Sequence, residues 1–481
     1  LPLVGALLRR TGAFFLRRSF KGEPLYAAVF HEYLHLMLTR GFPVEYFIEG
    51  GRSRHGRTLS PKAGILGMTI NSFIREHSRP LVFVPVYIGY EKLLEGRTYL
   101  REIAGKPKQK ESLWAIMKSA RQIKRVFGKV HLNFGEPLAL AAFLDACHAG
   151  WAGDEGGAPG AWSREATRSA AIALAARLND AVVVNPVNLI AITLLSTPRH
   201  TADEQSLERL LAHYQALIAK VPYSAAMISC DLEPSAIVAY VERLGFAQRI
   251  SHPLGDLIRI PDGEAPLLAY FRNNVLHAFA LPALVACLLS HSRYLGAPRL
   301  IEAVAGIYGL MKSELFLHDS SEGLQSATEA VIEVLVERGL LMRGEQGRLS
   351  APEANSPEFA ELRLLGEALR PMLERHFLTL SLLQHGGSGL RTRHSLENEC
   401  HLLAQRLALL YEFNSPEQSE KKAFSSLIAQ FVDAGLLRED EAGLLHFDQR
   451  ITTPLAHAEL VLPAETRQAI LRMACAGQLV R

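Results

Sequence analysis

Short apolar runs alternate with helical patterns over the first 140 residues, and this alternation constrains the fold more than any other feature. Three runs have the length and the aromatic and β-branched content of strands: PVEYFIEG (43–50), LVFVPVYIGY (81–90) and KVHLNFGEPL (129–138). Helical patterns lie between them, at 60–74 and 111–127. Strands that alternate with helices predict an α/β layer built on a mainly parallel sheet.

The first of these helical patterns carries a start signal. In SPKAGILGMTINSFI we expect Ser60 to be the N-cap and Pro61 to occupy the first helical position. The apolar residues that follow fall on one face at helical spacing. The pattern therefore predicts a helix that packs one side against the sheet.

Beyond about residue 164 the strand signals fade and helical patterns dominate. We therefore predict an α/β domain over residues 1–190 and a mostly helical domain over residues 191–481. A stretch rich in glycine and alanine, HAGWAGDEGGAPGAWS (148–163), is expected to form a mobile surface loop.

Neither a membrane span nor a disulfide framework is expected. The longest apolar run, around 276–289, contains His277 and Pro282 and is shorter than a bilayer span. The cysteines are odd in number, far apart and without a CxxC pair, which is typical of reduced core residues in a cytosolic protein; they are Cys147, Cys230, Cys287, Cys400 and Cys475.

Charge is distributed unevenly along a chain whose net charge is only +3. Residues 1–130 hold 23 Lys and Arg against 9 Asp and Glu, a net charge of +14, and the rest of the chain carries −11. A basic module of this kind suits a phosphorylated substrate, an acidic carrier protein, anionic lipid or nucleic acid.

The basic residues concentrate where the first predicted strand ends. Gly50 and Gly51 follow Glu49 and permit backbone conformations that other residues avoid. Arg52 and Ser53 come next, and Arg54 and Arg57 lie close behind. Lys62 lies near the start of the following helix, where the helix dipole disfavours a cation unless an anion is bound. The spacing fits a phosphate-binding loop, and a solvated basic loop explains it equally well.

Three stretches resemble, in order and spacing, the motif blocks of the bacterial membrane-associated glycerol-3-phosphate acyltransferases. FIEGGRSR resembles the third block, GAFFLRR (12–18) the second, and VFVPVYIGYE (82–91) the fourth. The resemblance implies glycerol-phosphate binding at positions of the second and third blocks and acyl binding at one position of the fourth. These positions are Phe14, Leu16, Arg18, Glu49, Gly50, Arg52, Ser53 and, for the acyl group, Pro85. We add Lys62 for its place at the helix start. The resemblance is weaker beyond about residue 200.

The resemblance also implies an activity and its setting. A member of this family transfers a fatty acyl group from acyl carrier protein or coenzyme A to the sn-1 hydroxyl of glycerol 3-phosphate, in phospholipid synthesis. We expect no metal or redox cofactor and no nucleic-acid partner. The expected location is the cytoplasmic face of the bacterial inner membrane, on an anionic lipid surface.

One block of the family is not found in this sequence. The first block supplies a histidine and, after four intervening residues, an aspartate, which the resemblance makes the general base and its orienting group. None of the 18 histidines is followed by an aspartate at that spacing. We expect the block to lie upstream of Leu1 and the chain as given to lack acyl transfer.

Three other interpretations compete with this one. HEYLH (31–35) satisfies the H-E-x-x-H pattern of zinc hydrolases, but no third ligand stands out, and an amphipathic helix explains it. Dihydroxyacetone phosphate is a second possible acceptor, although the paired glycines favour glycerol phosphate. A non-catalytic module that binds a membrane or carrier protein is the third.

Overall fold

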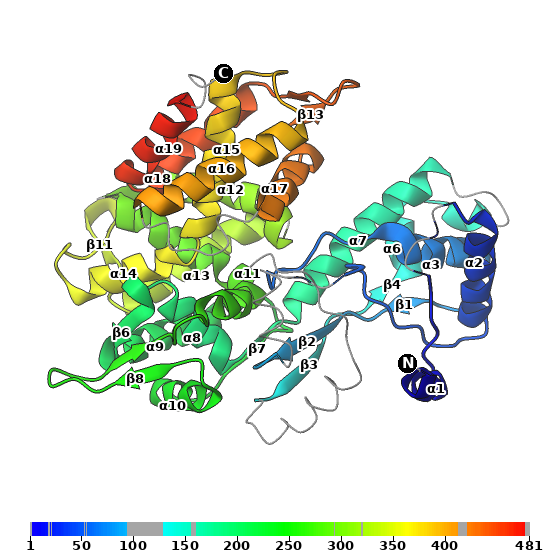
Figure 1. The fold of residues 1–481 in the computed structure, drawn as a ribbon, viewed down its shortest axis with the longest axis horizontal. Helices are drawn as coiled ribbons and strands as arrows, with labels where there is room; N and C mark the ends of the chain where they lie inside the picture. Colours follow the sequence, from blue (N-terminus) through cyan, green and yellow to red (C-terminus); the bar gives the residue numbers. More distant parts are fainter. Residues whose placement is uncertain are drawn as a thin grey trace. The chain divides into compact units, whose positions relative to one another are not determined.

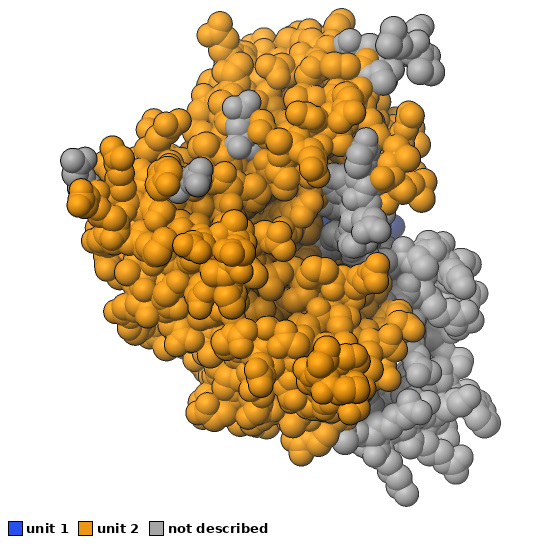
Figure 2. Space-filling model, turned by 90° about the vertical axis from the view of Figure 1, so that its left-hand side faces the viewer, with its two compact units in different colours: residues 1–51, 60–83, 137–174 blue, residues 52–59, 84–136, 175–481 orange. Residues whose placement is uncertain are grey.

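The chain forms two compact units, each assembled from several segments of the sequence. A computed structural model describes residues 2–17, 20, 22–51, 53, 55–93, 128–154, 160–292, 294–318, 321–411 and 421–476. Unit 1 comprises residues 1–51, 60–83 and 137–174. Unit 2 comprises residues 52–59, 84–136 and 175–481, and Figure 2 shows one face of it in orange. The predicted domain boundary at residue 190 stays a prediction, since the two units are interleaved along the chain.

Unit 1 contains helices around one short strand pair. The helices are α1 (Pro2–Arg10), α2 (Pro24–Thr39), α3 (Ala63–Arg75), α6 (Leu140–Cys147), η2 (Trp151–Asp154) and the N-terminal part of α7 (Ala161–Asp180). Strand β1 (Val82–Phe83) pairs antiparallel with β4 (Leu138–Ala139), as the ribbon of Figure 1 shows.

The core of unit 1 is built on one face of α3. Leu66, Ile70 and Phe73 of this helix are buried among apolar residues of α6 and α7. Trp151 is also buried and stacks on Phe73, with 5.4 Å between ring centroids. Burial of such side chains is worth about 1.5–3 kcal/mol each, so this face accounts for much of the stability of unit 1.

Unit 2 begins with an antiparallel pair and continues as a helical assembly. Strand β2 (Val86–Tyr90) pairs with β3 (Val130–Phe134), with Val86 opposite Phe134. The helices that follow are α8 (Pro186–Leu194), α9 (Glu204–Lys220), α10 (Pro234–Leu244), α11 (Ala265–His291), α12 (Ala297–Leu315), α13 (Ser321–Glu337), α14 (Pro357–Glu367), α15 (Arg370–Gly386), α16 (Arg393–Tyr411), α17 (Lys421–Asp433), α18 (Thr452–Val461) and α19 (Ala464–Ala476).

Short strands and single turns connect these helices. β5 (Val183–Val184) and β7 (Ile228–Ser229) form a parallel pair. The antiparallel strands are β6 (Thr201–Asp203), β8 (Gln248–Ile250), β9 (Leu257–Arg259), β10 (Leu295–Gly296), β11 (Met342–Arg343), β12 (Arg348–Ser350), β13 (Arg438–Glu439) and β14 (Leu445–His446). The 3₁₀ turns are η3 (Pro198–His200), η4 (Glu345–Gly347) and η5 (Gln449–Ile451).

Helix α11 is the central element of unit 2. It packs against α8, α12, α13, α14 and α18, all of which are labelled in Figure 1. Among the described residues it is the one helix long and apolar enough to cross a membrane, and 78% of its most apolar window is buried within the protein. The helix is thus longer than the apolar run suggested. Such extensive burial is typical of a core helix, and a core helix can be as long and as apolar as a membrane-spanning one.

The structure corrects several expectations about the first 165 residues. The pairs β1–β4 and β2–β3 are antiparallel, so a mainly parallel sheet is not what the described residues form. Residues 43–47 have no regular structure and 48–50 form a turn, so the strand expected there is absent. Its apolar side chains lack a partner strand, and Phe47 is 75% exposed. The long connection between β2 and β3 permits either strand direction. The alternation of strands and helices in the sequence therefore did not determine whether the strands are parallel.

Two boundaries also differ from expectation. Helix α3 begins at Ala63, and its N-cap is Lys62 with extended backbone angles rather than Ser60. The stretch expected to be a mobile loop includes η2 with the buried Trp151 and the first turn of α7. Trp151 stacks on Phe73, which accounts for the position of η2. Residues 155–159 of this stretch lie outside the described residues. The helix expected at 111–127 lies outside the described residues.

Candidate active site

The second-block residues lie in an extended segment ahead of α2. Residues 13–17 have no regular structure. Phe14 contacts Phe30 and Tyr33 of α2, with ring centroids 6.2 and 5.7 Å apart. Leu16 is 36% exposed. Arg18 lies outside the described residues.

Glu49, Gly50 and Lys62 come together at the N-terminus of α3 within unit 1. Gly50 lies in a turn with φ +60° and donates its N–H to the Phe47 carbonyl at 3.2 Å. The Lys62 N–H donates to the Ile48 carbonyl at 2.7 Å, which fixes the helix start against that turn. A Cβ atom at Gly50 would lie 2.7 Å from Cδ of Lys62. A glycine therefore lets the lysine stem lie directly on the turn, beside the positive end of the helix dipole.

The remaining third-block residues begin unit 2. Ser53 is half-buried, and Arg52 and Arg54 lie outside the described residues. Arg57 forms ion pairs within unit 2, with the carboxylate of Glu314 in α12. Arg57 is therefore committed to the protein interior, and nothing supports its use as a phosphate ligand.

Pro85 lies between β1 and β2 and is buried. Its carbonyl accepts the N–H of Gly135 at 2.8 Å, and a Cβ atom at Gly135 would come within 3.3 Å of the proline ring. The proline thus interrupts the run 81–90 and divides it into two strands with different partners. The structure places Ser53 and Pro85 in unit 2 and Phe14, Leu16, Glu49, Gly50 and Lys62 in unit 1.

Sequence reasoning missed a buried carboxylate at the end of the fourth block. Glu91 is 1% exposed and accepts from the Lys129 N–H at 2.5 Å, the Tyr240 hydroxyl at 2.5 Å and the His131 ring at 3.1 Å. Burial and the neighbouring carboxylate raise the pKa of Tyr240 to about 12. The cluster joins the β2–β3 pair to α10. The only sequence signal was an acidic residue at the end of an apolar run.

One of the two HEYLH histidines, His35, is part of a contact between helices. His35 is buried, and its Nδ1 lies 2.7 Å from the Ser72 hydroxyl while its Nε2 lies 3.4 Å from the Glu76 carboxylate. Both ring nitrogens are thus engaged by the α3 side of unit 1, which is a structural role. Within the described part of the chain, no group of three or more His, Cys, Asp or Glu is placed to hold a metal ion.

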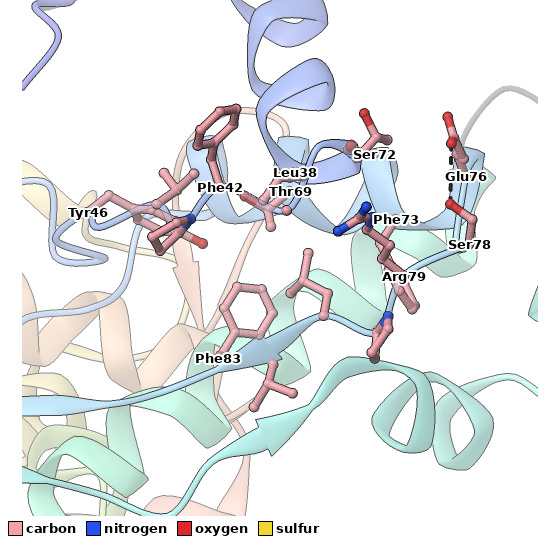
Figure 3. A pocket seen from close by; sticks show the side chains of 17 residues that line it. Leu38, Phe42, Tyr46, Thr69, Ser72, Phe73, Glu76, Ser78, Arg79 and Phe83 are labelled. Atoms are coloured by element: carbon pink, nitrogen blue, oxygen red, sulfur yellow. Dashed lines mark hydrogen bonds between the residues drawn. The ribbon is translucent and has the colours of Figure 1, made fainter. Parts of the chain in front are cut away.

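A pocket of about 260 Å³ opens in unit 1 between the α2–α3 side and the segment that leads into β1 (Figure 3). Its walls are mixed: apolar side chains such as Leu38, Phe42 and Phe83 line it together with polar ones such as Glu76 and Arg79. Tyr46 is a polar side chain in the wall, and burial raises its pKa to about 12, so the phenol stays neutral. An engineered apolar cavity of about 150 Å³ accepts a benzene-sized molecule, so this pocket can hold a short length of alkyl chain.

Two protein families match this sequence, and together they cover most of it. Residues 1–89 match the family described as acyltransferase, which contains the second- and third-block residues and the predicted acyl-binding proline. The motif blocks and this match therefore place the chain in the acyltransferase class. Residues 99–440 match the family described as the glycerol-3-phosphate acyltransferase C-terminal region, which includes most of the helical part of unit 2.

Curated relatives agree along almost the whole chain. The glycerol-3-phosphate acyltransferase of Pseudomonas fluorescens (strain SBW25) is 43% identical over 478 residues, 98% of this chain and 57% of the relative. Those of Pseudomonas aeruginosa (strain UCBPP-PA14) and Pseudomonas putida (strain W619) are 42% and 43% identical over the same length. The chain belongs to the glycerol-3-phosphate acyltransferase family.

The match extends well beyond residue 200, because the helical region is itself a family region. The chain spans about 57% of the length of these relatives.

Proposed function

We propose that this protein transfers a fatty acyl group from a thioester to the sn-1 hydroxyl of glycerol 3-phosphate, which gives lysophosphatidate for phospholipid synthesis. The observation that carries the proposal is the 42–43% identity, over 98% of the chain, to relatives named for this activity. The acyl donor is acyl carrier protein or coenzyme A, and the reaction needs no metal or redox cofactor.

The chemistry requires a base, an oriented acceptor and a thiol leaving group. The acceptor hydroxyl loses its proton as it attacks the thioester carbonyl, and the tetrahedral intermediate then expels the thiolate. General base catalysis typically contributes about 10²–10⁴-fold. We assign no general base within this chain, because none of its histidines carries the aspartate spacing of the family's first block.

The residues of this chain contribute to the reaction by binding and orienting the acceptor. Arg18, Arg52, Ser53 and Lys62 hold the phosphate, since guanidinium forks and hydroxyl donors match its oxygens. The position of Lys62, against Gly50 and at the N-terminus of α3, supports its part in this set. Glu49 accepts from a glycerol hydroxyl or fixes Arg52, and Phe14 and Leu16 shape the acceptor side.

The acyl chain is proposed to bind along the fourth block. Pro85 shapes its path, and the pocket of unit 1 takes part of the alkyl chain, because Val82 and Phe83 of that block line it. The protein is further proposed to work at an anionic membrane surface. The net charge of +14 over residues 1–130 and exposed apolar residues such as Leu25 support this.

The substitution Arg52→Lys tests the acceptor site in the protein of native length. A point charge replaces a fork, so kcat/KM for glycerol 3-phosphate should fall by roughly 1.5–3 kcal/mol. Steady-state kinetics with varied acceptor measures this. Arg164→Lys, on the exposed side of α7, is the matched control and should leave the kinetics unchanged. Unaltered acceptor kinetics in Arg52→Lys would remove Arg52 from the site.

A further inference from the structure

The four residues that follow the EGGRSR stretch are held by helices far away in sequence. Asn273 Nδ2 donates to the His55 carbonyl at 2.7 Å, and Asn274 Nδ2 donates to the Gly56 carbonyl at 2.7 Å. Both asparagines belong to α11 and lie 218 residues from their partners. Two consecutive main-chain carbonyls are thus bound by two consecutive side chains of the central helix of unit 2.

Gly56 brings the backbone of this segment into direct contact with α11. Its φ is +79°, and a Cβ atom there would lie 2.1 Å from the carbonyl oxygen of Tyr270. A backbone oxygen in a helix cannot move aside as a flexible side chain does. The closeness of the approach therefore requires glycine, and it leaves the segment little freedom to shift along the helix.

Thr58 extends the contact to the C-terminal end of α7. Its hydroxyl donates to Asn179 Oδ1 at 2.7 Å, and Asn179 Nδ2 donates to the Leu315 carbonyl at 2.7 Å. Asn179 is buried, so both of its amide groups are used within the protein. This relay joins the segment to the end of α12.

Arg57 completes the attachment through a buried cluster of charges. Its guanidinium pairs with Glu314, which also pairs with Arg375 of α15, and the side chains of all three are at most 13% exposed. Burial alone would raise the pKa of the Glu314 carboxyl, but the Arg375 and Arg57 guanidiniums outweigh it and bring the pKa down to about 2. The carboxylate therefore stays charged at any physiological pH. Breaking such a pair is costly because a charge remains buried without its partner.

We infer that Asn273, Asn274 and Glu314 are positioning residues for the acceptor phosphate: they fix His55–Arg57, and through the backbone they orient Ser53 just before it. This inference rests on the proposed function of the EGGRSR stretch and adds a role for the C-terminal helical region. A basic, glycine-containing loop would otherwise sample many conformations, and holding it beforehand lowers the entropy lost when the phosphate binds.

Two variants in the protein of native length test the inference. Asn274→Ala removes one neutral hydrogen bond at a half-buried position, and Glu314→Gln removes the charge that holds Arg57. In both we expect KM for glycerol 3-phosphate and the inhibition constant of inorganic phosphate to rise about tenfold. The KM for the acyl donor and kcat should stay within about twofold, because neither residue touches the donor or the reacting atoms.

Glu361→Gln is the matched control. Glu361 is a buried glutamate of the same unit that pairs with Arg209 at 2.6 Å and His213 at 2.9 Å, away from the loop. The same substitution there should lower thermal stability and leave both phosphate-dependent constants unchanged. If Glu314 has only a structural role, Glu314→Gln should behave like this control.

The outcomes separate this inference from the proposed function. Unaltered protein without glycerol-3-phosphate-dependent acyl transfer would reject the proposed function. Active unaltered protein, together with variants whose acceptor KM and phosphate inhibition do not change, would reject the positioning role alone. Equal increases in the KM of both substrates would reject it as well. If Glu314→Gln does not fold, the milder Asn274→Ala decides between these outcomes.

Discussion

The two units of this chain differ in the burial of their arginine–glutamate pairs. Two pairs of unit 1, Arg17–Glu23 and Arg75–Glu32, join side chains that are each about half exposed. Unit 2 has exposed pairs as well, such as Arg343–Glu333, but it also has pairs on buried glutamates, among them Glu314, Glu361 and Glu374. Exposed pairs contribute roughly 0–1 kcal/mol, whereas removing one member of a buried pair costs about 3–5 kcal/mol.

The apolar side chains follow the same division. Unit 2 has one continuous core that runs from α8 to α19. The core of unit 1 is small, and large apolar residues of α2 and the following turn, such as Leu25, Val29 and Phe47, are exposed. The contrast shows that the described residues of unit 2 share one extended core, whereas the core of unit 1 is small and leaves large apolar side chains of α2 exposed. The third block spans both, because its glycines belong to unit 1 and Ser53 to unit 2.

The same substitution at two glycines, one in each unit, should give the largest difference in stability loss between the units. Gly56→Ala places a Cβ atom against a helix carbonyl at positive φ, so we expect the free energy of unfolding to fall by about 3–5 kcal/mol. Gly50→Ala meets only the flexible stem of Lys62 and should cost about 1–2 kcal/mol. Chemical denaturation of both variants measures this. Equal losses would mean that the loop is not anchored more firmly in unit 2.

Acid should weaken unit 2 through Glu314. Its pKa is lowered from 4.5 to about 2 on folding, so its stabilisation is full above pH 4.5 and is lost as the pH falls towards 2. The linked free energy is about 3 kcal/mol. Burial also lowers the pKa of the neighbouring His376, so protonation of the unfolded chain begins to oppose folding below about pH 6.5.

The change Glu314→Gln tests this pH dependence. The variant should be less stable at neutral pH and should lose stability less steeply between pH 4.5 and 2, as measured by denaturation at several pH values. Glu32→Gln, in an exposed pair of unit 1, is the control, and its free energy of unfolding should still fall steeply between pH 4.5 and 2. If the free energy of unfolding falls steeply in both variants, groups other than Glu314 cause the acid sensitivity.

Filling the pocket of unit 1 should change donor choice without changing unit 2. Leu38→Trp adds volume to the wall of a 260 Å³ pocket, so long-chain thioesters should be disfavoured against short ones by about 1–2 kcal/mol. Competition between donors of two chain lengths measures the preference. Leu36→Trp, on an exposed face of the same helix, is the control. An unaltered preference would exclude the pocket from acyl binding.

The smallest expected effect concerns the exposed basic surface of unit 1. Arg9→Gln and Arg10→Gln should each weaken binding to anionic vesicles by about 1 kcal/mol, and salt should weaken it further. Vesicle sedimentation measures the binding. Arg438→Gln, on an exposed strand of unit 2, should change nothing. Binding that resists high salt and yields only to detergent would show that apolar insertion dominates.

Sequence reasoning succeeded where the signal was local. The helix at 60–74 was placed to within a few residues, because apolar spacing and a preceding proline specify it. The runs 81–90 and 129–138 do contain strands, but Pro85 divides the first and the irregular residues 135–137 divide the second. Strand direction was wrong because a long connection does not encode it. The partners of the basic loop were missed because Asn273 and Glu314 lie more than 200 residues away.

That distance along the chain has a consequence during protein synthesis. Arg57 and Glu314 are separated by 257 residues, and a ribosome adds about 5–20 residues per second. For tens of seconds after the basic loop leaves the ribosome, the carboxylate that holds it does not yet exist. The growing chain therefore carries its arginine-rich stretch unanchored, available to chaperones and anionic surfaces, until translation has passed Glu314.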